Sequence, residues 1–143
     1  MTLTELHKIW DKQNRGKAAP TEHALQAACV RWFRLQYHDF ADLLLAIPNG
    51  ARRTRWERGQ VLEEGLKAGT PDLFLAVPRG GMHGLWIEMK NGKAGRLSDS
   101  QKEMIAKLES QGYCVAVCHS MDEFMEIVGE YIFSDDTSAI SSK

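Results

Sequence analysis

Apolar residues recur at helical spacing in five stretches of the chain. Residues 20–37 form the longest of these stretches, and its apolar positions are Leu25, Ala28, Cys29, Trp32, Phe33 and Leu35. Side chains three or four positions apart lie on one face of a helix, so this stretch predicts a long helix that begins at Thr21. A short helix is predicted at the N-terminus, and others are predicted over residues 54–67, 98–112 and 121–132.

Four further stretches are short and apolar, which is typical of strands. They cover residues 42–48, 70–78, 84–90 and 113–120. The glycine-rich connection between the second and third predicts an antiparallel hairpin, whereas a helix separates the third from the fourth and predicts a parallel pair. The fold class is therefore α/β, with a mixed central sheet flanked by helices in the order α-α-β-α-β-β-α-β-α.

The predicted elements divide the chain into three parts. Residues 1–19 form an N-terminal helix and linker, residues 20–133 form the domain, and the polar residues 134–143 form a tail expected to be flexible. The total of 143 residues is enough for one compact domain with a substantial core.

Composition excludes several classes of protein. The chain is 43% hydrophobic and 26% charged, and it has no apolar run long enough to span a membrane. Three cysteines, an odd number, argue against a disulfide scaffold and favour a reducing compartment, so we expect a cytoplasmic protein. Cys114 and Cys118 are flanked by valines and have no second cysteine pair, which favours a place in the core over a zinc site.

The formal net charge is −1, but positive charge is concentrated locally. The segment "ARRTRWER" contains Arg52, Arg53, Arg55 and Arg58, and the segment "KNGKAGR" contains Lys93 and Arg96. Clusters of this kind bind nucleic-acid phosphates through a basic face. A solvated helix face without a ligand accounts for the four arginines equally well.

The stretch "GLWIEMK" combines core residues with charges. Side chains alternate along a strand, so Trp86, Glu88 and Lys90 share one face. Asp72 lies at the start of the preceding strand, and antiparallel pairing brings the start of one strand next to the end of the other. If the register places the charged faces on the same side, Asp72, Glu88 and Lys90 converge.

Two converging carboxylates repel each other unless one is protonated or a cation lies between them. Mg²⁺ and Mn²⁺ accept oxygen ligands from a few carboxylates and complete their shells with water and substrate phosphate. A lysine beside such an ion stabilises charge on a phosphate, so these residue types suit phosphodiester cleavage. The alternatives are an exposed Glu88–Lys90 ion pair and a plain turn role for Asp72.

Pro71-Asp72 followed by Glu88-Met89-Lys90 resembles the PD-(D/E)xK nuclease motif. Glu22 with Gln26, "PNG" with a nearby arginine, "GTPDL", "IEMK" and "LSDSQ" extend the resemblance to the virus-type replication-repair nuclease domain, VRR-NUC. This resemblance covers residues 20–128 and implies a restriction-endonuclease-like fold. The small stand-alone members come mostly from phages and bacteria, which implies a location in the bacterial cytoplasm.

The resemblance also implies site residues. Asp72 and Glu88 would be the principal metal ligands, with the main-chain carbonyl of Met89 as a further ligand and Lys90 as the catalytic lysine. Glu22 would serve a possible second ion, and Gln101 would complete the pocket. The simpler interpretations are that Glu22 complements the helix dipole and that Gln101 is an ordinary surface residue.

DNA is the partner that the resemblance implies. Asn49 and Arg52 or Arg53 match a segment that places substrate, and Arg55, Lys93 and Arg96 would add contacts to the backbone. The expected function is that of a homodimeric Mg²⁺- or Mn²⁺-dependent endonuclease of branched DNA, with four-way (Holliday) junctions as substrate. A catalytically silent module that binds DNA or protein, and a flap- or sequence-specific nuclease, are the alternatives. Replication, recombination and repair are all compatible pathways.

Overall fold

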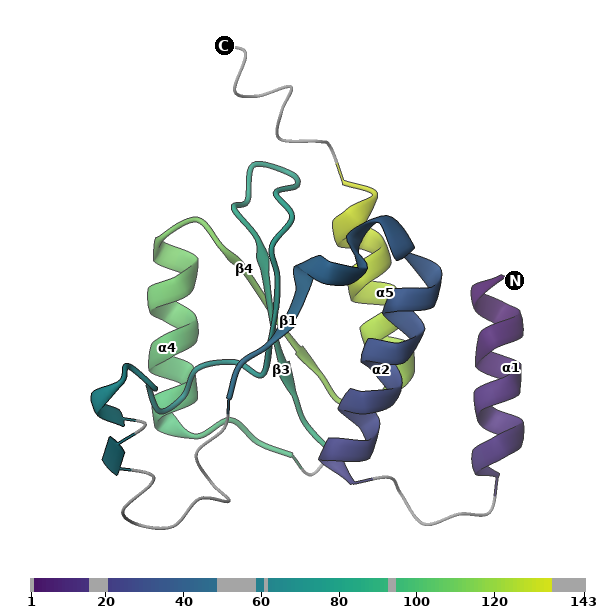
Figure 1. Ribbon diagram of the computed structural model, residues 1–143, viewed down its shortest axis with the longest axis horizontal. Helices are drawn as coiled ribbons and strands as arrows, with labels where there is room; N and C mark the ends of the chain where they lie inside the picture. The colour runs from purple at the N-terminus through teal and green to yellow at the C-terminus, as the bar shows by residue number, and fades with distance from the viewer. Residues whose placement is uncertain (1, 16–20, 49–58, 61, 93–94, 135–143) are drawn as a thin grey trace.

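The computed structural model describes residues 2–15, 21–48, 59–60, 62–92 and 95–134 (Figure 1). Its elements are α1 (Leu3–Asn14), α2 (Glu22–Gln36), the 3₁₀ helix η1 (His38–Leu43), β1 (Leu44–Ala46), β2 (Leu73–Leu75), β3 (Leu85–Met89), α4 (Asp99–Ser110), β4 (Cys114–Cys118) and α5 (Met121–Ile132). This is the α/β fold that the hydrophobic pattern predicts, with a mixed sheet flanked by helices.

The four strands lie in the order β1-β2-β3-β4. Strand β2 runs antiparallel to both β1 and β3, and β3 and β4 are parallel. Helix α4 connects the two parallel strands, as such a connection requires. Between β2 and β3, Gly80 and Gly81 both have positive φ, of 57° and 81°, and form the two-residue turn of the predicted hairpin.

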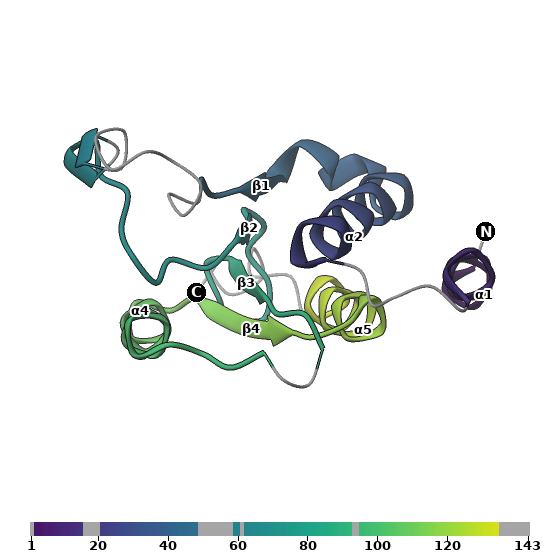
Figure 2. The same ribbon diagram turned by 90° about the horizontal axis from the view of Figure 1, so that it is seen from below.

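The helices cover the two faces of the sheet unequally. Helix α4 lies on one face, and α2 and α5 lie side by side on the other (Figures 1 and 2). Helix α1 lies beyond α2 and α5, away from the sheet. It begins with a capping box in which Thr2 and Glu5 bond each other's backbone N–H groups.

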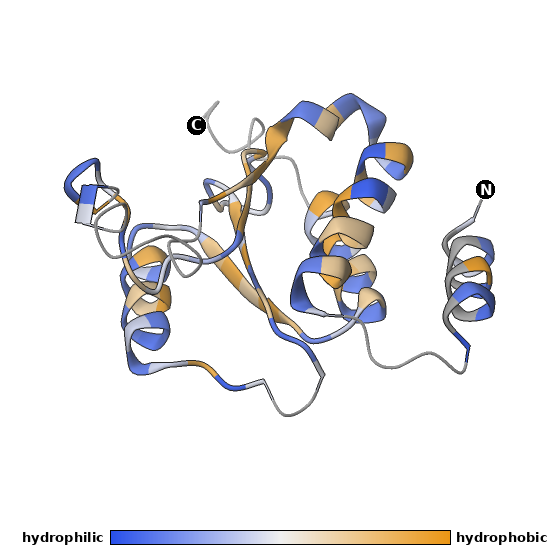
Figure 3. Ribbon diagram, turned by 60° about the horizontal axis from the view of Figure 1, so that its bottom comes forward, coloured by the Kyte–Doolittle hydropathy of each residue, from blue (hydrophilic) through white to orange (hydrophobic). Residues whose placement is uncertain are grey.

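The main core lies between the sheet and the α2–α5 face. Alternation along the strands buries Leu73, Leu75, Leu85, Ile87 and Met89 completely. Helix α2 contributes its own buried stripe at helical spacing, namely Leu25, Cys29, Trp32 and Phe33. The strands are accordingly the most continuously hydrophobic segments, while the helices carry hydrophilic residues on their outer sides (Figure 3). The apolar residues of β3 thus hold the strand rigidly in place.

The opposite face of the sheet is less completely covered. The rings of Phe74 and Trp86 stack with centroids 4.4 Å apart, and Tyr113 meets both edge-on. Side chains of β3 alternate as predicted, so Trp86 and Glu88 face this side while Met89 faces the core. At the end of β3, the charged side chain of Glu88 therefore points away from the main core, and the side chain of Met89 points into it.

The structure corrects three details of the predicted elements. Of the strand predicted over residues 42–48, only Leu44–Ala46 is a strand, residues 42 and 43 end the 3₁₀ helix η1, and the second strand is also shortened to three residues. Within the predicted helix at 54–67, the described residues 59–60 and 62–63 are helical, but the chain leaves the helix before Gly65, whose φ is 109°, and not at Gly69. Leu35 is 73% exposed, because it lies off the buried stripe of α2.

The cysteines are core residues rather than metal ligands. Cys118 is fully buried, Cys114 packs against the core, and Cys29 Sγ lies 3.5 Å from Met121 Sδ. All three are free thiols, and burial raises the pKa of Cys29 and Cys118 to about 12. Within the part of the chain that the structure describes, no helix is long and apolar enough to cross a membrane.

Candidate active site

Asp72 and Glu88 meet across the β2–β3 hairpin. Leu73 pairs with Ile87, so the next position outward places Asp72 beside Glu88 on the same face of the sheet. Asp72 Oδ2 also accepts a hydrogen bond of 2.7 Å from the backbone N–H of Met89. The register therefore brings together the two carboxylates that the sequence pattern predicts to converge.

Glu88 is buried, with 2% of its surface exposed, and it contacts a neutral amide and a cation. Gln101 Nε2 donates a hydrogen bond of 2.7 Å to Glu88 Oε1, and Lys90 Nζ lies 3.4 Å from the same oxygen. Lys90 is on the same face of the chain two residues later, and its side chain is only 13% exposed. The amide of Gln101 and the ammonium of Lys90 therefore meet at one oxygen of this buried carboxylate.

Gln101 is held in this position by the start of α4. Ser98 caps the helix by accepting from Gln101 N, and Gln101 Oε1 accepts from Ser98 N at 2.9 Å, which completes a capping box. The same oxygen accepts a 3.1 Å hydrogen bond from Lys90 Nζ. Gln101 thus links the helix cap to both Glu88 and Lys90, so it is not an ordinary surface residue.

The two carboxyl groups do not readily ionise together. Burial and, after it, the negative charges of Asp72 and Glu22 together raise the pKa of Glu88 to about 7, with Lys90 opposing the shift. Burial also raises the pKa of Asp72, against the lowering effects of the Met89 N–H, Lys90 and Glu88. Without a cation, ionisation of both groups is disfavoured, because two adjacent anions with little access to water would repel each other.

The backbone carbonyl of Met89 is placed to serve the same site. Lys90 N bonds Cys118 O, and Cys114 N bonds Gly84 O, so the even positions of β3 direct their backbone groups toward β4. The odd positions, including Met89, direct theirs toward β2. Continuing the register places Pro71 opposite Met89, and a proline has no N–H to donate to the Met89 carbonyl.

These residues surround a cavity of about 180 Å³. Its lining includes Asp72, Glu88, Gln101 and, from the start of α2, Glu22. Residues 66–70 close another side. The sequence pattern did not single out Lys67 or Thr70 in this loop, although their position directly before Pro71-Asp72 was a usable signal.

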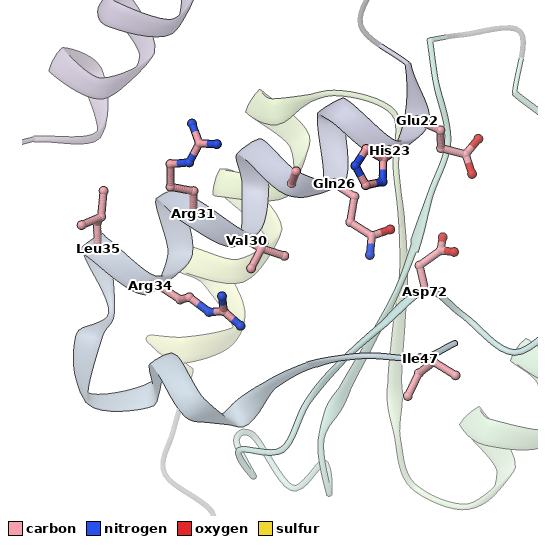
Figure 4. Close-up of a pocket in the computed structure, with 10 residues that line it drawn as sticks. Glu22, His23, Gln26, Val30, Arg31, Arg34, Leu35, Ile47 and Asp72 are labelled. Carbon is pink, nitrogen blue, oxygen red and sulfur yellow. The ribbon is translucent and has the colours of Figure 1, made fainter. Parts of the chain in front are cut away.

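A larger cavity of about 690 Å³ adjoins the first. It runs along α2 beside η1 and β1, and Figure 4 shows the Glu22 and Asp72 side chains at one end and Arg34 and Leu35 toward the other. Glu22, Ile47 and Asp72 line both cavities. The larger cavity is therefore a long open groove that ends at Asp72 and Glu22, where the smaller cavity with Glu88 begins.

The remaining predicted site residues are not part of this cluster. Asn49, Arg52, Arg53, Arg55 and Lys93 lie outside the described residues. Arg96 is described and exposed, and it lines neither of the two cavities.

The donor set suits a hard divalent cation. Among the described residues, no group of three or more His, Cys, Asp or Glu side chains is placed to hold a metal, so Glu22 does not form a third carboxylate ligand with Asp72 and Glu88. Mg²⁺ commonly uses only one or two carboxylates with waters and substrate phosphate. Two facing carboxylates of raised pKa and an available carbonyl fit that requirement.

Comparison with known proteins agrees with this geometry. The family model for the VRR-NUC domain matches residues 6–122. A solved structure titled "VRR_NUC domain protein" is 30% identical, with a TM-score of 0.74 over 83% of this chain and 93% of that one. A search of curated proteins gives no match. Because the family match spans most of the chain and the fold agrees, this protein belongs to the VRR-NUC family, nucleases of the PD-(D/E)xK type.

Proposed function

We propose that this protein is a metal-dependent endonuclease that hydrolyses phosphodiester bonds in branched DNA. Two observations carry the proposal: Asp72, Glu88 and Gln101 line one cavity, and Lys90 contacts both Glu88 and Gln101. Burial raises the pKa of both carboxyl groups, which is expected of a site that is completed by a cation.

Asp72 and Glu88 would hold the ion, with the Met89 carbonyl as a third oxygen ligand. Mg²⁺ or Mn²⁺, when bound, polarises a phosphoryl oxygen and lowers the pKa of a coordinated water. Glu22 lies at the edge of the same cavity and would serve a second ion through water.

Lys90 and Gln101 act on the substrate side of the same cluster. The ammonium of Lys90 is held by Glu88 and Gln101, which fixes its position before substrate arrives. A preorganised cation of this kind stabilises the negative charge that grows on the phosphate during cleavage. Gln101 is the positioning residue for both charged groups.

Branched DNA with two-fold symmetry, such as a four-way junction, fits a pair of identical sites. A homodimer with a two-fold axis would present two such sites to two equivalent phosphates. Arg52, Arg53 and Arg55 would contact the DNA backbone together with Asn49, Lys93 and Arg96. DNA repair, recombination and replication all supply substrates of this kind.

The test is a cleavage assay with labelled four-way junction, 5′ flap, 3′ flap, single strand and plain duplex. Each substrate is incubated with Mg²⁺, Mn²⁺ or EDTA, and light scattering after gel filtration gives the mass in solution. We expect symmetric cuts in the junction with Mg²⁺ or Mn²⁺, none with EDTA, and the mass of a dimer.

Asp72→Ala and Lys90→Ala are the controls. Cutting that persists in EDTA, or in both variants, would contradict the assigned site. Preference for a flap or for one duplex sequence would keep the nuclease but replace its substrate. Tight binding without cutting under any condition would indicate a DNA-binding module.

A further inference from the structure

The larger groove has a gradient of charge along its length. Glu22 and Asp72 lie at the end that joins the active site, and Arg31 and Arg34 lie farther along α2 (Figure 4). Val30 contributes an apolar surface beside them. The end near the carboxylates suits a phosphate that is bound through a cation, and the other end suits phosphates that are bound directly.

Among the described residues, no protein group binds the side chains of Arg31 and Arg34. Both are exposed, and within the part of the chain that the structure describes neither guanidinium forms an ion pair or a hydrogen bond. They are three residues apart, so they lie on one side of the helix. A planar guanidinium binds phosphate through two parallel hydrogen bonds.

The distance along α2 matches the spacing of nucleotides. A helix rises about 1.5 Å per residue, so Arg31 and Arg34 lie roughly 14 and 18 Å from Glu22 along the axis. One strand of duplex DNA advances about 3.4 Å per nucleotide. Because the strand also winds around the duplex axis, its phosphates are farther apart than the rise alone, so the arginines are placed for phosphates roughly two to four nucleotides from the bond at the active site.

We propose that this groove binds the backbone of the DNA strand that flanks the cleaved bond, with Arg31 and Arg34 as its phosphate contacts. The proposal rests on the proposed nuclease function and adds a substrate-binding track on α2. None of the residues predicted to contact DNA lies on this helix. The contacts are with phosphates, so they contribute affinity and register without reading the base sequence.

The test compares Arg31→Gln/Arg34→Gln with a variant of equal charge change. Lys12→Gln/Lys107→Gln also removes two positive charges, from exposed positions that line neither cavity. Binding to labelled junction DNA is measured by fluorescence anisotropy over a range of salt, in an Asp72→Asn background. We expect the slope of log affinity against log salt to fall by about 2 for the arginine pair and to change little for the lysine pair.

Two further measurements locate the contacts. Arg31→Lys/Arg34→Lys should restore most of the slope, because the charges return. Neutral methylphosphonate linkages at roughly the second to fourth nucleotides, tested on each side of the cleaved bond, should weaken binding by the Asp72→Asn protein on one side only. The same linkages should have no further effect on Arg31→Gln/Arg34→Gln.

The results separate this proposal from the proposed function. If the wild-type protein cuts DNA but the arginine pair keeps the parental slope, the groove does not bind the backbone. An equal loss of slope in the lysine pair would overturn the proposal as well, since net charge would then explain it. If the wild-type protein neither cuts nor binds any DNA substrate, the proposed function itself fails.

Discussion

Gln101 bridges the carboxylate and the ammonium of the active site. Its Nε2 donates to Glu88 Oε1 at 2.7 Å, and its Oε1 accepts from Lys90 Nζ at 3.1 Å. The same oxygen accepts from the N–H of Ser98 at the start of α4. One amide therefore couples the position of a helix to the two charges that the chemistry requires.

Gln101→Ala should weaken both the fold and the activity. The substitution removes one half of the capping box and the 2.7 Å hydrogen bond to Glu88, which should cost about 1–3 kcal/mol of unfolding free energy. Loss of a group that orients metal-site residues typically lowers activity by about 10- to 100-fold. Urea unfolding and junction-cleavage rates measure the two effects.

Gln101→Glu changes the charge at the active site without removing the helix cap. Glutamate preserves the capping box but places a second negative charge against Glu88. We expect the pKa of Glu88 to rise further and activity to require a higher pH, while the stability of α4 is retained. An unchanged pH profile would contradict the assigned contact.

The stability of the metal-free protein should depend on the protonation of Glu88. The pKa of Glu88 is raised from 4.5 to about 7, so the folded state binds more protons than the unfolded state between these values. The free energy of unfolding should therefore fall as pH rises through this range, by at most about 3 kcal/mol. Above pH 7 this contribution is absent. Asp72, whose pKa is also raised, adds to the same slope.

Glu88→Gln should flatten that dependence, because the amide cannot ionise and the charge on Asp72 loses its neighbour. Chemical denaturation in EDTA at several pH values measures the effect. Stability that rises with pH from 4.5 to 7 in the wild-type protein, and not in the variant, would show that the sign is wrong.

Asp72→Asn should reduce metal binding while leaving the fold intact. The asparagine oxygen still accepts from the Met89 N–H, which spans 2.7 Å in the structure, but the negative charge is gone. Titration calorimetry with Mn²⁺ should show a loss of affinity of at least about tenfold. Asp39→Asn removes the same charge from an exposed position on η1 that lines neither cavity and should leave the affinity unchanged.

Gly69→Ala should disturb the loop that carries Asp72 into the site. Gly69 has a φ of 85°, and a Cβ there would overlap the carbonyl of Ser100 and lie 2.9 Å from Gln101 N. Gly65 has a φ of 109° and open space around it, so Gly65→Ala should cost only about 1–2 kcal/mol for the left-handed backbone. Thermal unfolding should show a clearly larger loss for Gly69→Ala, and equal losses would argue against the close approach of the loop to α4.

Sequence reasoning succeeded for features that depend on local periodicity. Alternation along residues 84–90 predicted that Glu88 and Lys90 share a face and that Met89 enters the core, and the structure confirms both placements. It failed at boundaries, because the end of the helix before Gly65 and the inclusion of residues 42 and 43 in a 3₁₀ helix depend on how the chain packs. Gln101 was expected to complete the pocket from the family resemblance, but its bonds to Glu88 and Lys90 come from segments that local spacing does not relate.

The sequence by itself determined the elements, the α/β class and the residue types at the site, because side-chain periodicity and helix caps act over a few neighbouring residues. Tertiary structure alone decided that Asp72 and Glu88 stand side by side, that Pro71 faces Met89, and that α2 borders a groove leading to them. These relationships join residues that are distant in the chain. Sheet register and helix packing set them, and both depend on burying the whole core at once.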